Sequence, residues 1–184
     1  MDLSDEDWDY VIKLILIGDS WVGKTSLLGR FNNPATDYVL KTHTTIGYDF
    51  STKFFEQDDK IIQVHLWDTT GQEKYKSLVK TYYKRAMAAI WVYDITKYET
   101  FENAERWISD LRENGENNAE VIVVGNKVDL REKRMVSEEE GKEFAKKHKA
   151  LFIEASASTG KNVKTIFDYI LNRVIDSIKE HEKI

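Results

Sequence analysis

The residues with the clearest chemical potential lie near the start of the chain, in residues 17–26, which read IGDSWVGKTS. A glycine, four residues and then Gly-Lys-Thr form the spacing of a phosphate-binding loop. Backbone N–H groups of such a loop surround phosphate oxygens, the lysine reaches the β and γ phosphates, and the threonine hydroxyl coordinates Mg²⁺. The predicted nucleotide-binding residues are Ser20, Trp21, Val22, Gly23, Lys24, Thr25 and Ser26, with Lys24 also catalytic and Thr25 also a metal ligand.

A large aromatic side chain, Trp21, stands in the middle of this loop. The phosphates lie against backbone there, so an indole cannot fit inside the loop and must point outward. If the backbone at this position is left-handed, a residue other than glycine costs about 1–2 kcal/mol. Two interpretations follow: an exposed ring without a role, or a ring over the mouth of the site that changes nucleotide exchange and Mg²⁺ capture.

A candidate metal ligand follows a later apolar segment. Asp68 comes directly after residues 60–67, which have the pattern of a strand. A carboxylate at a strand end beside a phosphate site is suited to hold Mg²⁺, often through water. A lone aspartate in this place can instead cap a helix, but the phosphate-binding loop favours the metal interpretation.

Two further loops predict which base the site selects. In the segment Asn126-Lys127-Val128-Asp129, the carboxylate of Asp129 can only accept hydrogen bonds, and guanine offers two donors side by side. A wrong base would leave this carboxylate unpaired at a cost of roughly 1–3 kcal/mol. The apolar stem of Lys127 could cover the base, and the loop at residues 154–157, which is small-residue from Ala155 on, could bring backbone N–H groups to the guanine O6.

The elements that must position these loops follow from hydrophobic periodicity. Short apolar runs predict buried strands, and looser alternation on either side of residues 57–59 predicts an antiparallel hairpin. A capping box at residues 137–140 predicts the start of a helix. The expected strands are residues 11–17, 48–56, 60–67, 88–93, 121–124 and 151–153, and the other expected helices are residues 24–31, 101–112 and a final apolar stripe at 163–178.

Strands that alternate with helices imply a three-layer α/β fold with a mainly parallel sheet. Ligands of such sheets bind beyond the carboxyl ends of the strands, and the candidate loops all follow predicted strands. The length of 184 residues suits one domain, which we expect at residues 10–180 after an acidic tail at residues 1–9.

Composition and charge exclude several classes of protein. The net charge of −5, without a basic stripe, argues against a nucleic-acid partner. The absence of cysteine excludes disulfides, thiolate metal sites and lipidation of a cysteine within this chain. The acidic N-terminus does not read as a signal peptide, and no apolar run is long enough to cross a bilayer. We therefore expect a cytoplasmic protein without a membrane anchor in this chain.

Taken together, these motifs resemble those of the small GTPases of the Ras superfamily, and most closely those of the Rab branch. The resemblance implies the P-loop GTPase fold: a six-stranded, mostly parallel sheet with one antiparallel strand and helices on both faces. It extends from about residue 10 to about residue 175 and rests on residues 18–25, 45–50, 67–72, 82–83, 93–96, 126–129 and 156–157.

The resemblance also implies individual roles. Thr45 in the first switch loop would bind Mg²⁺ and the γ-phosphate region, and Asp68 would support Mg²⁺ in the second. Gln72 would orient the attacking water, and the backbone N–H of Gly71 would contact the γ-phosphate. Tyr38 would stack on the guanine. The remaining nucleotide-binding residues would be Asn126, Lys127, Asp129, Ser156, Ala157 and Ser158.

The implied function is a molecular switch that binds GDP or GTP with Mg²⁺, hydrolyses GTP slowly and acts in vesicular trafficking. Its implied partners are effectors, an exchange factor and a GTPase-activating protein, which act through the two switch loops. The alternative is an interaction module that holds nucleotide with little turnover. A P-loop kinase is disfavoured, because residues 45–50 and 126–129 would then be coincidences.

Four features depart from the family pattern. Trp21 stands where Gly or Ala is usual, Thr70 where Ala is usual, and Ser158 where Lys is usual. Trp21 and Thr70 favour the module with little turnover. The sequence ends at Ile184 without a cysteine-bearing tail, which we interpret as truncation rather than continuation into a larger protein. Membrane association would then need residues beyond this chain or a partner.

Overall fold

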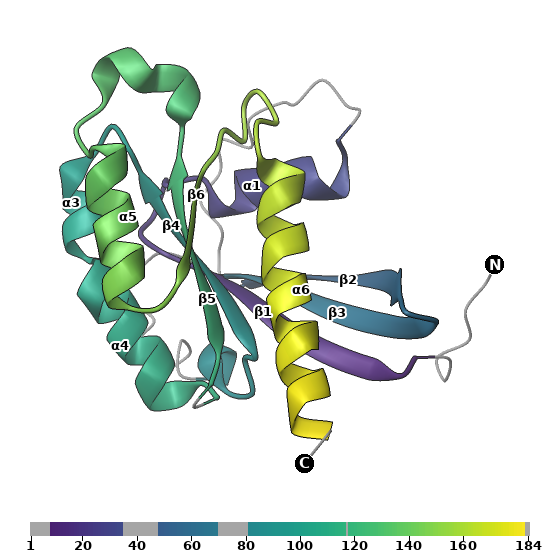
Figure 1. Ribbon diagram of the computed structural model, residues 1–184. Helices are drawn as coiled ribbons and strands as arrows, with labels where there is room; N and C mark the ends of the chain where they lie inside the picture. Colours follow the sequence, from purple (N-terminus) through teal and green to yellow (C-terminus); the bar gives the residue numbers. More distant parts are fainter. Residues whose placement is uncertain (1–7, 35–47, 70–80, 117, 183–184) are drawn as a thin grey trace.

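A six-stranded sheet forms the centre of the computed structural model, which describes residues 8–34, 48–69, 81–116 and 118–182 (Figure 1). The strand order is β2-β3-β1-β4-β5-β6, with β2 antiparallel to β3 and the other neighbours parallel. The predicted sheet is therefore confirmed. The strands are β1 (Tyr10–Ile17), β2 (Tyr48–Gln57), β3 (Lys60–Thr69), β4 (Ala88–Asp94), β5 (Glu120–Asn126) and β6 (Leu151–Glu154).

Helices cover both faces of this sheet, as the α/β prediction requires. Leu14 of β1 packs in a core with buried residues of α1 and α6, whereas the next residue, Ile15, packs in a second core with residues of α4 and α5. Successive residues of a strand point to opposite faces, so the two cores lie on opposite sides of the sheet. The helices are α1 (Lys24–Asn32), α3 (Tyr98–Glu102), α4 (Ala104–Asn114), the 3₁₀ helix η2 (Val128–Lys133), α5 (Glu138–Lys147) and α6 (Val163–Glu182).

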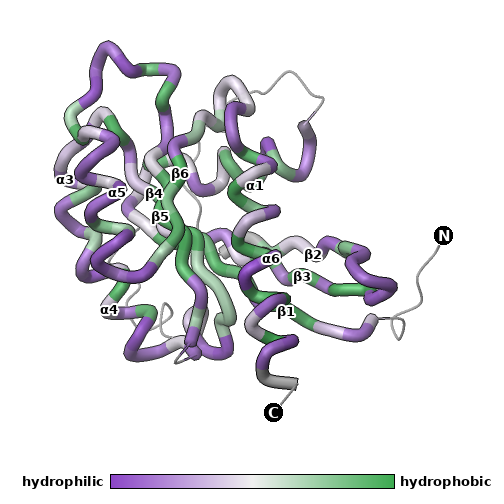
Figure 2. The backbone as a smooth tube through the Cα atoms, viewed as in Figure 1, coloured by the Kyte–Doolittle hydropathy of each residue, from purple (hydrophilic) through white to green (hydrophobic). Residues whose placement is uncertain are grey.

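The middle of the sheet is almost completely buried. Every residue of β4 is buried, and six of the seven residues of β5 are buried. Figure 2 shows the hydrophobic colouring gathered on these central strands. Burial on both faces explains why the apolar runs in the sequence are continuous rather than alternating.

The predicted helix at residues 101–112 is in fact two helices. Helix α3 ends at Glu102 and α4 begins at Ala104, with Asn103 between them at φ −75° and ψ 0°. The side chain of Asn103 donates a hydrogen bond to Asp19, 84 residues away. Sequence periodicity could not show this break, because the contact at the break is long-range.

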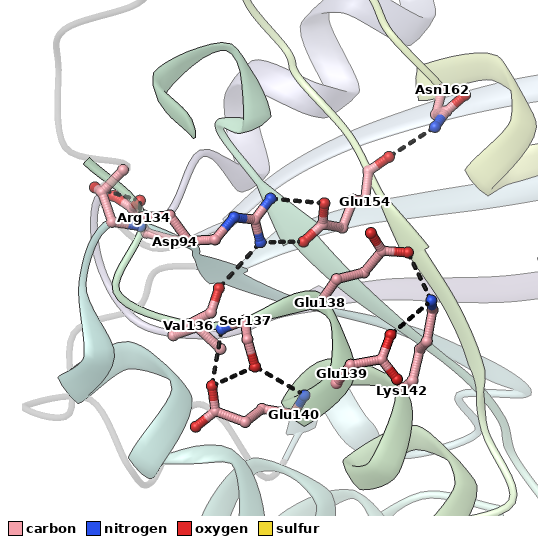
Figure 3. Close-up of polar contacts among 11 residues, drawn as sticks. Asp94, Arg134, Val136, Ser137, Glu138, Glu139, Glu140, Lys142, Glu154 and Asn162 are labelled. Carbon is pink, nitrogen blue, oxygen red and sulfur yellow. Dashed lines mark hydrogen bonds and ion pairs between the residues drawn. The ribbon is translucent and has the colours of Figure 1, made fainter. Parts of the chain in front are cut away.

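Local signals in the sequence are confirmed where the structure describes them. Asp58 and Asp59 both have positive φ, as the tight turn of the β2–β3 hairpin requires. Ser137 and Glu140 form the expected capping box, with backbone-to-side-chain distances of 3.2 and 2.8 Å (Figure 3). In α6 the predicted apolar stripe is buried from Val163 to Ile175.

The described part of the N-terminal segment contacts the domain. The backbone N–H of Asp9 donates to the Ile61 carbonyl at 2.8 Å, and the Asp9 carboxylate pairs with Lys60 at 2.6 Å. The ring of Trp8 lies 6.5 Å from that of Phe54. Of the tail predicted at residues 1–9, residues 1–7 lie outside the described residues. Among the described helices, none combines the length and apolar character that crossing a membrane requires.

Candidate nucleotide site

The four candidate loops follow β1, β3, β5 and β6, whose carboxyl ends meet at one edge of the sheet. Residues 18–23 join β1 to the N-terminus of α1, Asp68 lies at the end of β3, residues 127–129 follow β5, and residues 155–158 follow β6. The structure therefore brings together those predicted binding residues that it describes. Tyr38, Thr45, Thr70, Gly71 and Gln72 lie outside the described residues, so their roles remain predictions.

The backbone of the phosphate-binding loop depends on its two glycines. Gly18 has φ +133°, and a Cβ there would lie 2.2 Å from the carbonyl oxygen of Val92. Gly23 has φ +101°, and a Cβ there would lie 2.3 Å from the amide nitrogen of Asn126. The loop ends at the first turn of α1, which has no side-chain cap, so backbone N–H groups are available for an anion.

The lysine of the loop is drawn inward. Lys24 is 5% exposed, and its ammonium donates to the carbonyl oxygens of Gly18 and Asp19 at 2.8 Å each. Burial lowers the pKa of Lys24 to about 8, while the charges of Asp68 and Asp19 act in the opposite direction. These contacts hold the cation at the centre of the loop, where a phosphate would provide a stronger partner.

Two of the three predicted metal ligands, Thr25 and Asp68, lie in direct contact. The Thr25 hydroxyl donates to the Asp68 carboxylate, which is buried at the end of β3, and the Thr69 hydroxyl ties that strand end to the Leu16 carbonyl at 2.6 Å. The described residues contain no cluster of three or more His, Cys, Asp or Glu that could hold a metal alone. One hydroxyl and one carboxylate suit Mg²⁺ that also binds phosphate oxygens and water, so these residues fit the implied ion.

Asn126 connects three of the loops rather than standing free for a base. Its side-chain amide donates to the Val22 carbonyl at 2.8 Å, and its amide oxygen accepts from the Ala157 N–H at 3.2 Å. The residue is 1% exposed. Its predicted place at the nucleotide site is consistent with this position, and its visible function is to hold the loops together.

The predicted guanine selector is exposed but anchored. Asp129 lies in η2 rather than in a loop, and one carboxylate oxygen accepts from the Ser156 hydroxyl at 2.6 Å. The Ser156 oxygen in turn accepts from the N–H of Thr159 at 3.1 Å. Ser156 is fully buried, so its hydroxyl anchors the Asp129 carboxylate to the loop after β6.

Lys127 links the base loop to the phosphate-binding loop. Its ammonium donates to the Trp21 carbonyl at 2.8 Å and pairs with the carboxylate of Asp94 at 2.6 Å. Asp94 is 1% exposed, and it also accepts from the N–H and hydroxyl of Thr96. Asp94 belongs to a motif that carries the family resemblance, but no local pattern in the sequence showed its partner.

Trp21 points outward, as predicted. Its φ is +68°, and it is 58% exposed, whereas the predicted neighbours Val22 and Ser26 are buried and Ser20 is partly buried. Trp21 therefore has a left-handed backbone conformation despite its large side chain. Whether the indole contacts residues 35–47 is outside the described structure.

Two arginines support the loop after β6, and the sequence analysis identified neither. Arg134 holds Glu154 through two parallel contacts of 2.5 and 2.9 Å, which raise the pKa of the arginine (Figure 3). Arg30 of α1 donates to the carbonyls of Ala157 and Ser158 at 3.1 and 2.8 Å. Both act between segments far apart in the sequence, which periodicity cannot pair.

A phosphate-binding motif at a parallel sheet edge, joined through one asparagine to the loop predicted to select the base, is the arrangement of a P-loop nucleotide-binding protein. A sequence model described as the Ras family matches residues 13–176. Ras-related protein Rab-11A of Dictyostelium discoideum is 47% identical over 93% of this chain and 79% of its own length. Ras-related protein Rab11B of Nicotiana tabacum is 44% identical over 93% and 78%, and Ras-related protein RABA1e of Arabidopsis thaliana is 43% identical over the same shares.

The chain therefore belongs to the Ras family. Within it, the identities of 43–47% make the protein a Rab-like small GTPase.

Proposed function

We propose that this protein is a guanine-nucleotide switch that binds GDP or GTP with Mg²⁺ and hydrolyses GTP slowly. The observation that carries the proposal is the double contact of Asn126 with Val22 and Ala157. This contact fixes the phosphate-binding loop against both base loops, so that a single ligand with a phosphate end and a base end spans them.

The described residues of the site have separate parts in this proposal. Lys24 exchanges its backbone partners for phosphate oxygens, and Thr25 and Asp68 supply the protein oxygens for Mg²⁺. Bound Mg²⁺ supplies neutralisation of charge on the phosphate oxygens. Asp129, oriented by Ser156, accepts the two guanine donors.

The residues assigned to the hydrolytic step come from the resemblance to small GTPases. Gln72 orients the attacking water, the N–H of Gly71 contacts the γ-phosphate, Thr45 completes the Mg²⁺ ligands and Tyr38 stacks on the base. Phosphoryl transfer relies on positioning and charge stabilisation, and a partner often supplies an arginine. Slow hydrolysis by the isolated chain is therefore expected.

Nucleotide selectivity tests the proposal directly. GDP, GTP, ADP and ATP would compete for one fluorescent guanine nucleotide on Mg²⁺-loaded protein. We expect GDP and GTP to displace the label and the adenine nucleotides to fail, because adenine places a different set of donors and acceptors against Asp129. Equal competition by ATP and GTP would refute guanine selectivity.

The partners and cellular place are also proposals, supported by likeness to proteins named Rab11. Effectors, an exchange factor and a GTPase-activating protein would contact the two switch loops, as in vesicular trafficking. The protein would act from the cytoplasm and reach a membrane through a partner or through residues beyond this chain. Nucleic acid is not an expected ligand, given the net charge of −5.

A second candidate, an interaction module with little turnover, is favoured by the exposed Trp21 in the phosphate-binding loop. Single-turnover hydrolysis of GTP separates the two candidates. If hydrolysis in the parent is undetectable but Trp21→Gly restores it, the module is supported; measurable hydrolysis in the parent supports the switch.

A further inference from the structure

The second residue of the phosphate-binding loop, Asp19, reaches out of the loop to the start of α4. Its carboxylate accepts from the side-chain amide of Asn103 at 2.7 Å and from the indole N–H of Trp107 at 2.8 Å. The Arg106 guanidinium lies 3.6 Å from the same carboxylate. The Asp19 side chain is 18% exposed, so these contacts replace most of its hydration.

The backbone of the same residue holds the central cation of the site. The Asp19 carbonyl accepts from the Lys24 ammonium at 2.8 Å. The preceding residue, Gly18, packs so closely on β4 that a Cβ there would lie 2.2 Å from the Val92 carbonyl oxygen. Asp19 therefore connects Lys24 to helix α4: its backbone carbonyl binds Lys24, and its side chain binds the start of α4.

The direction of the Asp19 side chain also has an electrostatic reason. A carboxylate in a loop that surrounds phosphate would repel the ligand if it pointed into the loop. Asn103, Trp107 and Arg106 satisfy and partly neutralise the charge on the α4 side. The break between α3 and α4 at Asn103 places that amide beside the carboxylate.

We propose that Asp19, held by Asn103 and Trp107, is a positioning residue that lengthens the residence time of the bound nucleotide by fixing the phosphate-binding loop and Lys24 against helix α4. This inference rests on the proposed guanine-nucleotide function and adds a residue remote from the base. It makes α4 part of the nucleotide site without any contact between α4 and the ligand.

The indole N–H of Trp107 can be separated from the packing of its ring. Trp107→Phe keeps an aromatic ring in a position that is 5% exposed and removes the donor to Asp19, together with part of the buried ring. Trp91→Phe is the matched control, because Trp91 is fully buried in the same apolar core and its N–H has no hydrogen-bond partner among the described residues. A general cost of losing an indole would appear in both variants.

The experiment measures release of a fluorescent GDP from the full chain in Mg²⁺, after excess unlabelled GDP is added. Loss of a hydrogen bond to a charged group typically changes an equilibrium by about tenfold or more, so we expect Asp19→Ala to release GDP about tenfold faster and Trp107→Phe about fivefold faster. Asp19→Asn keeps an acceptor for Trp107, so its release rate should be closer to that of the parent than to that of Asp19→Ala. Trp91→Phe should stay within about twofold of the parent.

A double mutant provides the stricter test. If Trp107 acts through Asp19, then Trp107→Phe should change release less than about twofold in the Asp19→Ala background. The preference for GDP over ADP should stay unchanged in Asp19→Ala, because base selection belongs to Asp129. An effect of Trp107→Phe that persists in full without Asp19 would overturn the inference, as would normal release from Asp19→Ala.

The proposed function and the positioning role of Asp19 can be refuted separately. A parent protein that binds ATP as well as GTP would refute the proposed function itself. A parent that is selective for guanine, with Asp19→Ala and Trp107→Phe unchanged in GDP release, would overturn only the positioning role. If Asp19→Ala does not fold, Asn103→Ala and Trp107→Phe test the same contacts from the α4 side.

Discussion

Trp21 is a large residue with a left-handed backbone conformation. The strain of this conformation can be measured. At φ +68°, a residue other than glycine costs about 1–2 kcal/mol. Glycine relieves this strain, but it also adds conformational freedom to the unfolded chain, which lowers the free energy of unfolding by about 0.4–1 kcal/mol. Trp21→Gly should therefore raise the free energy of unfolding by up to about 1.6 kcal/mol, and by about 0.8 kcal/mol at the midpoints of the two ranges, over a variant that keeps the strain.

The variant that keeps the strain is Trp21→Ala, which lacks the indole but retains a β-carbon. The comparison of Gly with Ala removes any contribution of the ring, and the Lys127 contact to the backbone carbonyl at this position is available in both. We would measure urea unfolding at one fixed GDP and Mg²⁺ concentration, because bound ligand adds to stability. A Trp21→Gly variant that is less stable than Trp21→Ala would refute the argument that the backbone at this position is strained.

The same two variants test the role of the ring in exchange. We expect the indole to obstruct closure of the first switch loop over the nucleotide, so both Trp21→Gly and Trp21→Ala should release GDP more slowly than the parent. Release within about twofold of the parent, with no nucleotide-dependent Trp21 fluorescence, would instead support an exposed ring without a role.

Three further predictions follow from the described contacts. Asp129→Asn should shift nucleotide preference from guanine toward xanthine, because the amide can donate where the carboxylate only accepted, and unchanged preference in competition binding would count against the base assignment. Ser137→Ala should cost about 0.5–2 kcal/mol in urea unfolding at neutral pH. The side-chain hydrogen bond from Ser137 holds the pKa of Glu140 below its ordinary value of 4.5, so the capping box stabilises the fold above that value. The difference between parent and Ser137→Ala should thus shrink as the pH falls through the lowered pKa, and a pH-independent difference would contradict this. Gly18→Ala should destabilise the fold by roughly 2 kcal/mol or more, since its β-carbon would meet the Val92 carbonyl. Gly160→Ala is the control, with positive φ but its nearest neighbour at 3.7 Å, and an equal loss in both would show that backbone strain alone is responsible.

Much of the fold could be predicted from the sequence because its signals are local. Continuous apolar runs marked β1, β4 and β5, and the capping box marked the start of α5. These patterns depend on residues within one element, so they survive in the structure. The break at Asn103 was missed because its side-chain partner is in the phosphate-binding loop.

The candidate site was predicted as a set of loops but not as a network. The spacing around Lys24 and the acceptor chemistry of Asp129 pointed to phosphate and guanine without any tertiary information. The contacts of Lys127 with Trp21 and Asp94 join residues that are distant in the sequence or that had no assigned role. Only a three-dimensional structure could pair them.

The double contact of Asn126 has a consequence for how the protein is made. Val22 is synthesised 104 residues before Asn126, and the Ala157 N–H that Asn126 also binds is synthesised 31 residues later. A ribosome adds roughly 5–20 residues per second, so the first loop of the site waits several seconds for its partners. A nascent chain that ends before β5 contains the complete phosphate-binding motif and the residues that hold Asp19, but it lacks Asn126 and Lys127, which bind the carbonyls of Val22 and Trp21. Capture of guanine nucleotide should therefore mark the end of synthesis of this domain, and the nucleotide would stabilise the finished chain rather than guide its early folding.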